Sequence, residues 1–336
     1  MQKTAEFVSP KHPDKICDVI ADTLLAAYMK GDPASRVAIE VMGGHGHVSL
    51  SGEVTSGAKD DVDIDLEKIV RGVPGVPDGV AIHAYLTRQS PEIGSGVDTG
   101  GAGDQGIMVG YATSETPERL PREYVLARDL CKKIYAKYPY DGKTQVTIND
   151  EGSIATVVAS FQNAPHDELL AFVREALPGA GEYLINPTGD WALGGFDADS
   201  GLSGRKLIVD NYGPEIPIGG GSFSGKDWTK VDRSGAYMAR RVAVDYLERE
   251  LAKGASAKGA PVASVRVKLA YAIGKAEPVM AVAAITNTDG SSREVAIAPD
   301  EYDLTPRGLF NALKLGTIDW PSTAVWGHFG REFPWG

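Results

Sequence analysis

Gly201-Leu-Ser-Gly-Arg-Lys206 and Gly219-Gly-Gly-Ser-Phe-Ser-Gly-Lys-Asp-Trp-Thr-Lys-Val-Asp-Arg-Ser234 are the two most informative stretches of this chain. They set lysines and arginines among glycines and two acids, Asp227 and Asp232. Glycine lets backbone N–H groups approach an anion closely, and the cations supply positive charge. A carboxylate among them is a ligand for a hard metal ion. This composition predicts a site for a polyphosphate with magnesium.

The rest of the chain is acidic, so these cations are a local concentration. Its 336 residues carry a net charge of −11, which argues against general nucleic-acid binding. Residues 1–8 lack the apolar core of a signal peptide, and no apolar run approaches the ~20 residues of a membrane span. We therefore expect a cytoplasmic protein with no membrane partner, in which Cys17 and Cys131 are reduced.

Local periodicity predicts helices that alternate with pairs of strands. Helices are expected over 13–30, 61–71, 121–135, 167–177, 229–251 and 306–314. Strands are expected over 36–42, 47–54, 79–86, 143–148, 154–161, 182–185, 207–211, 265–272, 279–286 and 294–298, with a loop over 89–106. Three successive segments each hold a strand pair and a helix, so the pattern predicts an α+β chain of three similar layered units. We expect an N-terminal domain over 1–93, a central one over 99–189 and a C-terminal one over 190–336.

Two familiar fingerprints match only in part. Gly101–Gly106 fits GxGxxG, but the glycine-rich residues before it do not form the strand that a dinucleotide site needs. Gly220–Lys226 fits GxxxxGK, but Asp227 stands where a P-loop has Ser or Thr. A P-loop remains an alternative, and a phosphate-binding glycine loop of another kind fits better.

A third run of polar residues lies where the first predicted helix begins. Ser9–Lys15 places His12 and Asp14 at a helix N-terminus, which attracts anions. His12 is a candidate donor to a phosphate oxygen, and Asp14 is a candidate metal ligand. The ordinary alternatives are a surface histidine and an acid that favours the helix dipole. His45 and His47 are interpreted as exposed turn residues.

Taken together, these runs closely resemble the S-adenosylmethionine synthetases, or methionine adenosyltransferases. The matching segments extend over the whole chain in family order: His12–Lys15, Gly101–Gly110, Gly142–Thr147, Ile185–Gly189, Gly201–Asp210, Gly219–Ser234, Tyr271–Gly274 with Ala276–Pro278, and His328–Trp335. The runs GAGDQG and GGGxFSGKDxxKVDRS are highly specific to this family.

The resemblance implies a fold, a reaction and an assembly. The fold is α+β, with three similar α/β-layered domains around a pseudo-threefold axis. In the reaction the sulfur of L-methionine attacks C5′ of ATP and expels tripolyphosphate, which is then hydrolysed to diphosphate and phosphate. The assembly is a homodimer that pairs through its sheets, with active sites between the subunits and a dimer of dimers as the alternative.

The resemblance also implies roles for single residues. The catalytic group consists of His12, at the bridging oxygen, with Lys143, Arg205, Lys206 and Lys226. ATP binding adds Asp141, Trp191 (in place of the family's usual phenylalanine) and Lys230. Methionine binding involves Glu53, Gln89, Asp104, Asp199, Lys230 and Ile273. Asp14 and Asp232 are implied ligands of two Mg²⁺ ions, and Glu40 of K⁺.

The chain departs from the family pattern in places. Pro10 and Lys11 replace the usual residues before His12, the loop after Gln89 is short, and Asp190 stands where a basic residue is common. Two other classes remain as alternatives. One is a tripolyphosphatase or ATPase without methionine binding, which the presence of Glu53, Gln89 and Asp199 argues against. The other is a non-catalytic regulatory subunit, which the complete set of cations disfavours.

Overall fold

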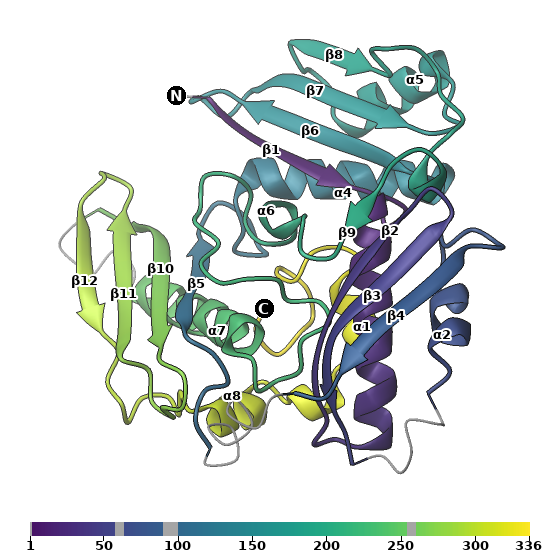
Figure 1. The fold of residues 1–336 in the computed structure, drawn as a ribbon. Helices are drawn as coiled ribbons and strands as arrows, with labels where there is room; N and C mark the ends of the chain where they lie inside the picture. The colour runs from purple at the N-terminus through teal and green to yellow at the C-terminus, as the bar shows by residue number, and fades with distance from the viewer. Residues whose placement is uncertain (1, 58–63, 90–99, 254–259) are drawn as a thin grey trace.

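Three four-stranded sheets make up the framework of the part of the chain that the structure describes. A computed structural model of the chain describes residues 2–57, 64–89, 100–253 and 260–336. Figure 1 shows the three sheets at the periphery and the C-terminus near the middle. The arrangement confirms the predicted α+β class with three similar layered units.

Each sheet is built on three strands that follow one another in the sequence. The first sheet contains β2 (Arg36–Gly44), β3 (His47–Thr55) and β4 (Ala81–Thr87). The second contains β6 (Gly142–Ile148), β7 (Ile154–Phe161) and β8 (Glu182–Ile185). The third contains β10 (Val262–Tyr271), β11 (Met280–Asn287) and β12 (Ser292–Ala296). The last strand is parallel to its neighbour in the first two sheets but antiparallel in the third, where a tight turn at Asp289 and Gly290 connects it.

The fourth strand of each sheet comes from a distant part of the chain. β1 (Lys3–Val8) pairs with β6, β5 (Gly106–Thr113) with β10, and β9 (Gly201–Leu202) with β2. The sequence thus repeats one strand followed by three, and each single strand completes the sheet of another repeat (Figure 1). This cyclic exchange joins the three sheets. The domain boundaries expected from the sequence stay a prediction.

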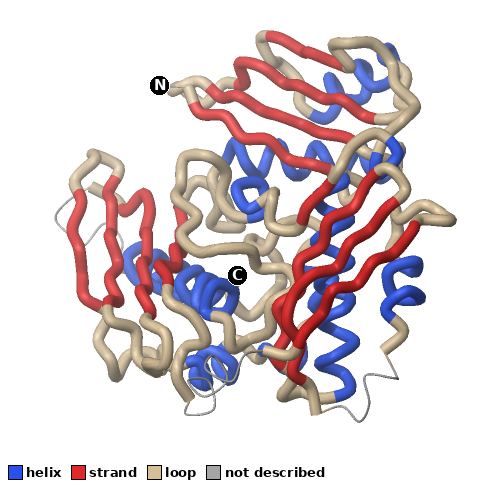
Figure 2. Tube along the Cα trace, viewed as in Figure 1, coloured by secondary structure: helices blue, strands red, loops and turns tan. Residues whose placement is uncertain are grey.

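One long helix covers the inner face of each sheet (Figure 2). α1 (Pro13–Gly31) packs on β2 and β9, α4 (Arg122–Lys137) on β1 and β6, and α7 (Val231–Ala252) on β5 and β10. The apolar residues Ile16, Ile20 and Leu24, one turn apart, are at most 1% exposed on α1. The shorter helices are α2 (Leu66–Gly72), α5 (His166–Ala176), α6 (Leu207–Asp210), α8 (Pro306–Ala312) and α9 (Trp320–Thr323).

Most of the predicted elements are confirmed within a few residues, and one is wrong. Residues 207–211, predicted as a strand, form α6, in which Asp210 N–H donates to the Lys206 carbonyl. The apolar Leu-Ile-Val run is too short for its periodicity to separate a strand from a helical turn. The start of the predicted helix over 61–71 and most of the predicted loop over 89–106 lie outside the described residues.

Two smaller predictions concern the cysteines and the membrane. Cys17 and Cys131 are buried free thiols, as expected. Within the described ranges, no helix combines the length and the apolar character needed to cross a membrane.

Candidate active site

His12 is the N-cap of α1, and its ring is held in one orientation. Its Nδ1 accepts a hydrogen bond from the Asp14 backbone N–H at 3.2 Å. Nδ1 is therefore an acceptor, and the ring hydrogen of the neutral imidazole is on Nε2. Burial lowers the pKa of His12 to about 3, and the positive charges of Lys206 and Lys143 act in the same direction. At neutral pH this side chain is an uncharged donor.

Asp14 joins His12 to the first of the two cation-rich loops. Its carboxylate is fully buried and accepts the Leu202 N–H at 2.9 Å and the Lys206 ammonium at 2.5 Å. The Arg205 guanidinium lies 3.4 Å from the same carboxylate. Burial alone would raise the pKa of Asp14, but the hydrogen bonds from Lys206 and Leu202 outweigh it and lower this pKa.

The start of β6 and the segment after β8 approach the same place. Asp141 accepts the Gly195 N–H at 3.0 Å, and the charges of Lys143 and Asp199 act on its carboxylate. Trp191 donates from its indole to Ser160, which stands opposite Lys143 in the sheet. We call the following group the His12 cluster: His12, Asp14, Asp141, Lys143, Trp191, Asp199, Arg205 and Lys206.

The second cation-rich loop folds around Asp232, in the first turn of α7. Lys226 Nζ lies 2.6 Å from one carboxylate oxygen of Asp232, and the Gly221 N–H donates to the other at 3.1 Å. A Cβ added to Gly220 would lie 2.6 Å from that carboxylate. The backbone therefore approaches this carboxylate closely, and glycine leaves room for it.

Two further loops bring Asp104 and Ile273 to this region. The Ala102 N–H donates to the Lys275 carbonyl, and the Gly274 N–H donates to the Ala102 carbonyl, both at 2.9 Å. The Gly103 N–H donates to the Thr229 carbonyl, next to α7. No helix begins within 101–106, which leads directly into β5, so this run lacks the helix that a dinucleotide fingerprint opens.

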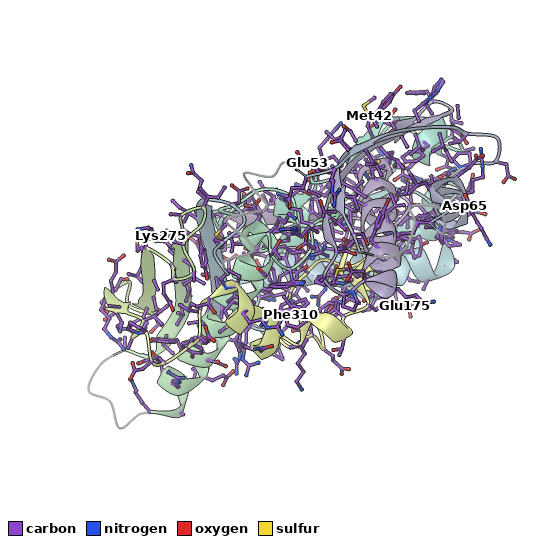
Figure 3. All side chains as sticks on the ribbon, turned by 60° about the horizontal axis from the view of Figure 1, so that its bottom comes forward. Met42, Glu53, Asp65, Glu175, Lys275 and Phe310 are labelled. Atoms are coloured by element: carbon purple, nitrogen blue, oxygen red, sulfur yellow. The ribbon has the colours of Figure 1, made fainter. Side chains whose placement is uncertain are left out.

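The first sheet contributes one row of residues to the same region. The backbone of Lys226 forms an isolated antiparallel β-bridge with Ala38 of β2. Ala38 is opposite Glu53 of β3, and Glu53 is opposite Thr87 at the end of β4. Figure 3 labels Glu53 on this sheet. Gln89 follows β4, and its Oε1 is buried without a hydrogen-bond partner among the described residues. We call the following group the Lys226 cluster: Glu53, Gln89, Asp104, Lys226, Lys230, Asp232 and Ile273.

Lys230 differs from the other predicted phosphate ligands. It is 7% exposed, and its ammonium lies 2.6 Å from Asp227. Asp227 is fully buried and also accepts the Val37 N–H at 2.6 Å. Asp227 therefore anchors the loop to β2, while Asp232 faces Lys226.

The two clusters meet through their loops. A Cβ on Gly204 would lie 2.7 Å from the side chain of Ser222, so the two glycine-rich loops are in direct contact. Glu40 lies between them. It accepts a short hydrogen bond from Ser203, and Lys226 is close enough for its positive charge to act on the Glu40 carboxylate. A cavity of about 550 Å³ adjoins Arg205 and Lys206. A smaller one of about 190 Å³ adjoins Asp141. Neither of these two cavities is lined by residues of both clusters.

Asp14 and Asp232 fit magnesium in one specific way. Within the described part of the chain, no three His, Cys, Asp or Glu side chains gather into a metal-binding group. Mg²⁺, however, commonly uses one or two carboxylates together with substrate phosphates. Each of these carboxylates lies beside a lysine, where a bound polyphosphate would bring its own oxygens.

Sequence reasoning missed three residues that organise the site: Asp18, Asp22 and Ser203. The spacing of Asp14, Asp18 and Asp22 at i, i+4 and i+8 on one helix is the signal that would have revealed the two aspartates. Asp190, which departs from the family pattern, has a structural role. It accepts the N–H of His166, the first residue of α5, at 3.0 Å and the Asn186 side-chain amide at 3.1 Å.

Comparisons with known proteins find matches over nearly the whole chain. Three family models match: the S-adenosylmethionine synthetase N-terminal domain over residues 1–74, the central domain over 99–191 and the C-terminal domain over 193–336. The S-adenosylmethionine synthases of Nocardia farcinica and Thermus thermophilus are each 39% identical, over 99% of this chain and 94% of the relative. A solved structure described as an unusual S-adenosylmethionine synthetase from Campylobacter jejuni superposes with a TM-score of 0.81. It is 33% identical and covers 99% of this chain and 96% of its own.

Proposed function

Since this chain belongs to the S-adenosylmethionine synthetase family, we propose that it makes S-adenosylmethionine from ATP and L-methionine. The observation that carries the proposal is the neutral His12 donor beside Asp14, Lys206 and Arg205. This arrangement suits a substrate with several phosphates better than a single anion.

The proposed reaction is one displacement at C5′ of the ribose. The methionine sulfur forms a bond to C5′ while the C5′–O bond breaks, and tripolyphosphate leaves with the electron pair. A thioether is a neutral nucleophile and needs no general base. The barrier lies in the charge that grows on the departing oxygen, which fixed donors and cations stabilise.

His12 is proposed to donate its Nε2 hydrogen to that bridging oxygen. A neutral imidazole donates without placing a buried charge in the site, as its lowered pKa requires. Lys206, Arg205 and Lys143 are proposed to contact the phosphates from the same side.

The Lys226 cluster is proposed to hold the other side of the polyphosphate. Lys226 supplies charge, and the glycine backbone of 219–221 supplies N–H donors. Lys230 is proposed to contact phosphate and methionine as well, once its ion pair with Asp227 has rearranged. Two Mg²⁺ ions, bound through Asp14 and Asp232, would neutralise phosphate charge when present. K⁺ is proposed to bind near Glu40, where the Ser203 hydroxyl adds an oxygen ligand.

The remaining predicted residues are proposed to hold the organic parts of the substrates. Trp191 and Asp141 are placed to contact the nucleoside, and Asp199 belongs to the same cluster. Glu53, Gln89, Asp104 and Ile273 are proposed to contact methionine and the base. The buried Gln89 oxygen, which has no hydrogen-bond partner among the described residues, supports this role, because such a group normally has one.

We further propose a homodimer whose active sites lie between subunits, located in the cytoplasm. Met42 and Leu202 stand opposite each other on the outer face of the first sheet, and Tyr85 lies nearby on the same face. Their exposed fractions are 56%, 37% and 67%, and Figure 3 places Met42 at the molecular surface. Apolar side chains clustered in this way are typical of an interface. A partner subunit would bring a Lys226 cluster to each His12 cluster.

The test is to incubate the purified protein with ATP, L-methionine, Mg²⁺ and K⁺, and to measure both products. We expect S-adenosylmethionine together with equal amounts of diphosphate and phosphate. Hydrolysis of ATP or tripolyphosphate without any sulfonium product would instead identify a phosphatase that has lost methionine binding.

A further inference from the structure

Three aspartates on one side of α1 bind the backbone of both glycine-rich loops. Asp14 accepts the Leu202 N–H, Asp18 the Gly204 N–H and Asp22 the Gly225 N–H, each at 2.9 Å. The aspartates are four residues apart, so they are stacked along a single face of the helix. One rigid element therefore sets the positions of two loops that are distant in sequence.

Asp18 and Asp22 are each also paired with a buried cation. Asp18 lies 3.2 Å from Lys15 Nζ, which Asp210 holds from the other side at 2.7 Å. Asp22 receives two bonds from Arg233, at 2.7 and 2.9 Å. Asp18 and Asp22 are at most 2% exposed, so neither carboxylate can exchange its partners for water.

The residues that these carboxylates hold directly precede the proposed phosphate-binding cations. Gly204 comes just before Arg205 and Lys206, and Gly225 comes just before Lys226. Arg233 extends the second connection, because it donates to the Lys226 carbonyl at 3.2 Å while it binds Asp22. Asp22 thus constrains the backbone on both sides of Lys226.

The surroundings leave these glycines little room to relax. Gly204 and Gly225 have left-handed backbones, with φ of +76° and +81°. A Cβ on Gly225 would lie 2.0 Å from the Ile39 carbonyl oxygen. Loss of the aspartate contact would therefore shift the loop as a unit and not only one side chain.

We propose that Asp18 and Asp22 are positioning residues for the reaction, each of which fixes the cations of one glycine-rich loop where the leaving polyphosphate requires them. This inference rests on the proposed function, and it adds two residues to those that contact substrate. A misplacement of about 1 Å in such a site lowers the rate by roughly a hundredfold.

The test is a pair of double-mutant cycles measured on the full-length protein. Asp22→Asn is combined with Lys226→Met, and Asp18→Asn with Lys206→Met. Each asparagine alone should lower kcat by about a hundredfold, with KM for methionine nearly unchanged. If the aspartates act through the lysines, each double variant should have the kcat of its lysine variant within about twofold. The proposal would be overturned if the two single-variant losses in kcat multiplied in the double variant, or if the asparagine variants kept the wild-type kcat.

A control separates positioning from simple loss of stability. Arg240→Gln removes another fully buried charge from α7. The Arg240 guanidinium donates to the Tyr111, Glu118, Arg119 and Gly336 carbonyls, which lie outside both clusters. This variant should lower the melting temperature and leave kcat per folded molecule unchanged. Calorimetric binding of tripolyphosphate provides a readout that does not depend on synthesis: Asp18→Asn and Asp22→Asn should weaken it by about tenfold or more. If the wild-type protein makes no S-adenosylmethionine, the proposed function fails, while this binding comparison still decides the positioning role.

Discussion

Lys226 contacts Asp232 across the glycine loop, and the two side chains mark where phosphate and metal are proposed to meet. Lys226→Met keeps the length of the side chain and removes its charge. We expect kcat to fall by about a hundredfold or more, equivalent to about 3 kcal/mol, with a smaller effect on ATP binding. Steady-state kinetics of synthesis measures this loss. Lys133→Met, an exposed position on α4, is the matched control. A rate near that of the wild type would remove Lys226 from the transition state.

His328 is buried in the core and makes stability depend on pH. Its Nδ1 lies 2.7 Å from the Tyr237 hydroxyl. Burial lowers the pKa of His328 well below its usual 6.5, and the charges of Arg233, Lys15 and Arg331 add to this effect. Below pH 6.5 the unfolded chain therefore binds a proton that the folded protein does not, so stability falls as the pH falls and is unaffected above that value.

The corresponding experiment compares the wild type with His328→Asn by urea unfolding between pH 7.5 and 5. The advantage of the wild type should shrink on acidification, by at most about 1.4 kcal/mol per pH unit. Parallel curves for the two proteins would mean that His328 does not titrate differently on unfolding.

The contact between the glycine loops is a feature of the elements around the site. Gly204→Ala would place a methyl group 2.7 Å from Ser222 and keep the left-handed backbone at φ +76°. Gly79 has nearly the same φ, +75°, and nothing within 4 Å of an added Cβ. Gly79→Ala should cost only the conformational strain of about 1–2 kcal/mol. Gly204→Ala should cost more and should also lower kcat, because it shifts the loop that carries Arg205 and Lys206. Urea unfolding and kinetics of both variants test this, and equal effects would argue against the contact.

Local sequence patterns predicted those elements whose partners are close in the sequence. The apolar stripe of α1 and the strands of the pairs β2–β3, β6–β7 and β10–β11 were identified, because each buries one face in a regular period. Strands β1 and β5 were not recognised, and β9 contains only two residues. Their pairing partners lie far along the chain, so local periodicity does not reveal these strands.

The site could be predicted only in part for the same reason. Glycines and cations in a short run indicate phosphate, which made Lys226 and Arg205 recognisable. The contacts of Asp18 and Asp22 depend on which loop lies against α1, and this becomes visible only in the fold. Asp190 shows the reverse case. It departs from the family pattern next to a proposed ligand, and the fold explains it, because its carboxylate accepts the first N–H of α5.

At the scale of the whole molecule, the outer face of the first sheet is proposed to bind a second copy of the chain. Tyr85→Arg would place a charge on this face, and we expect the dimer to dissociate into monomers with little activity. Glu175→Arg, on α5, introduces the same side chain elsewhere and should leave the assembly intact. Light scattering combined with activity measurements over a range of protein concentrations tests this. A monomer with full activity would contradict the proposed shared site.

The exchange of edge strands also has a consequence for biosynthesis. The first sheet lacks its fourth strand, β9, until residues 201–202 have been synthesised. Likewise, β1 has no partner strand until β6 has left the ribosome. A nascent chain therefore carries unpaired strand edges through most of its translation, and unpaired edges invite association with other chains. We infer that early termination yields fragments that aggregate instead of folding one unit at a time.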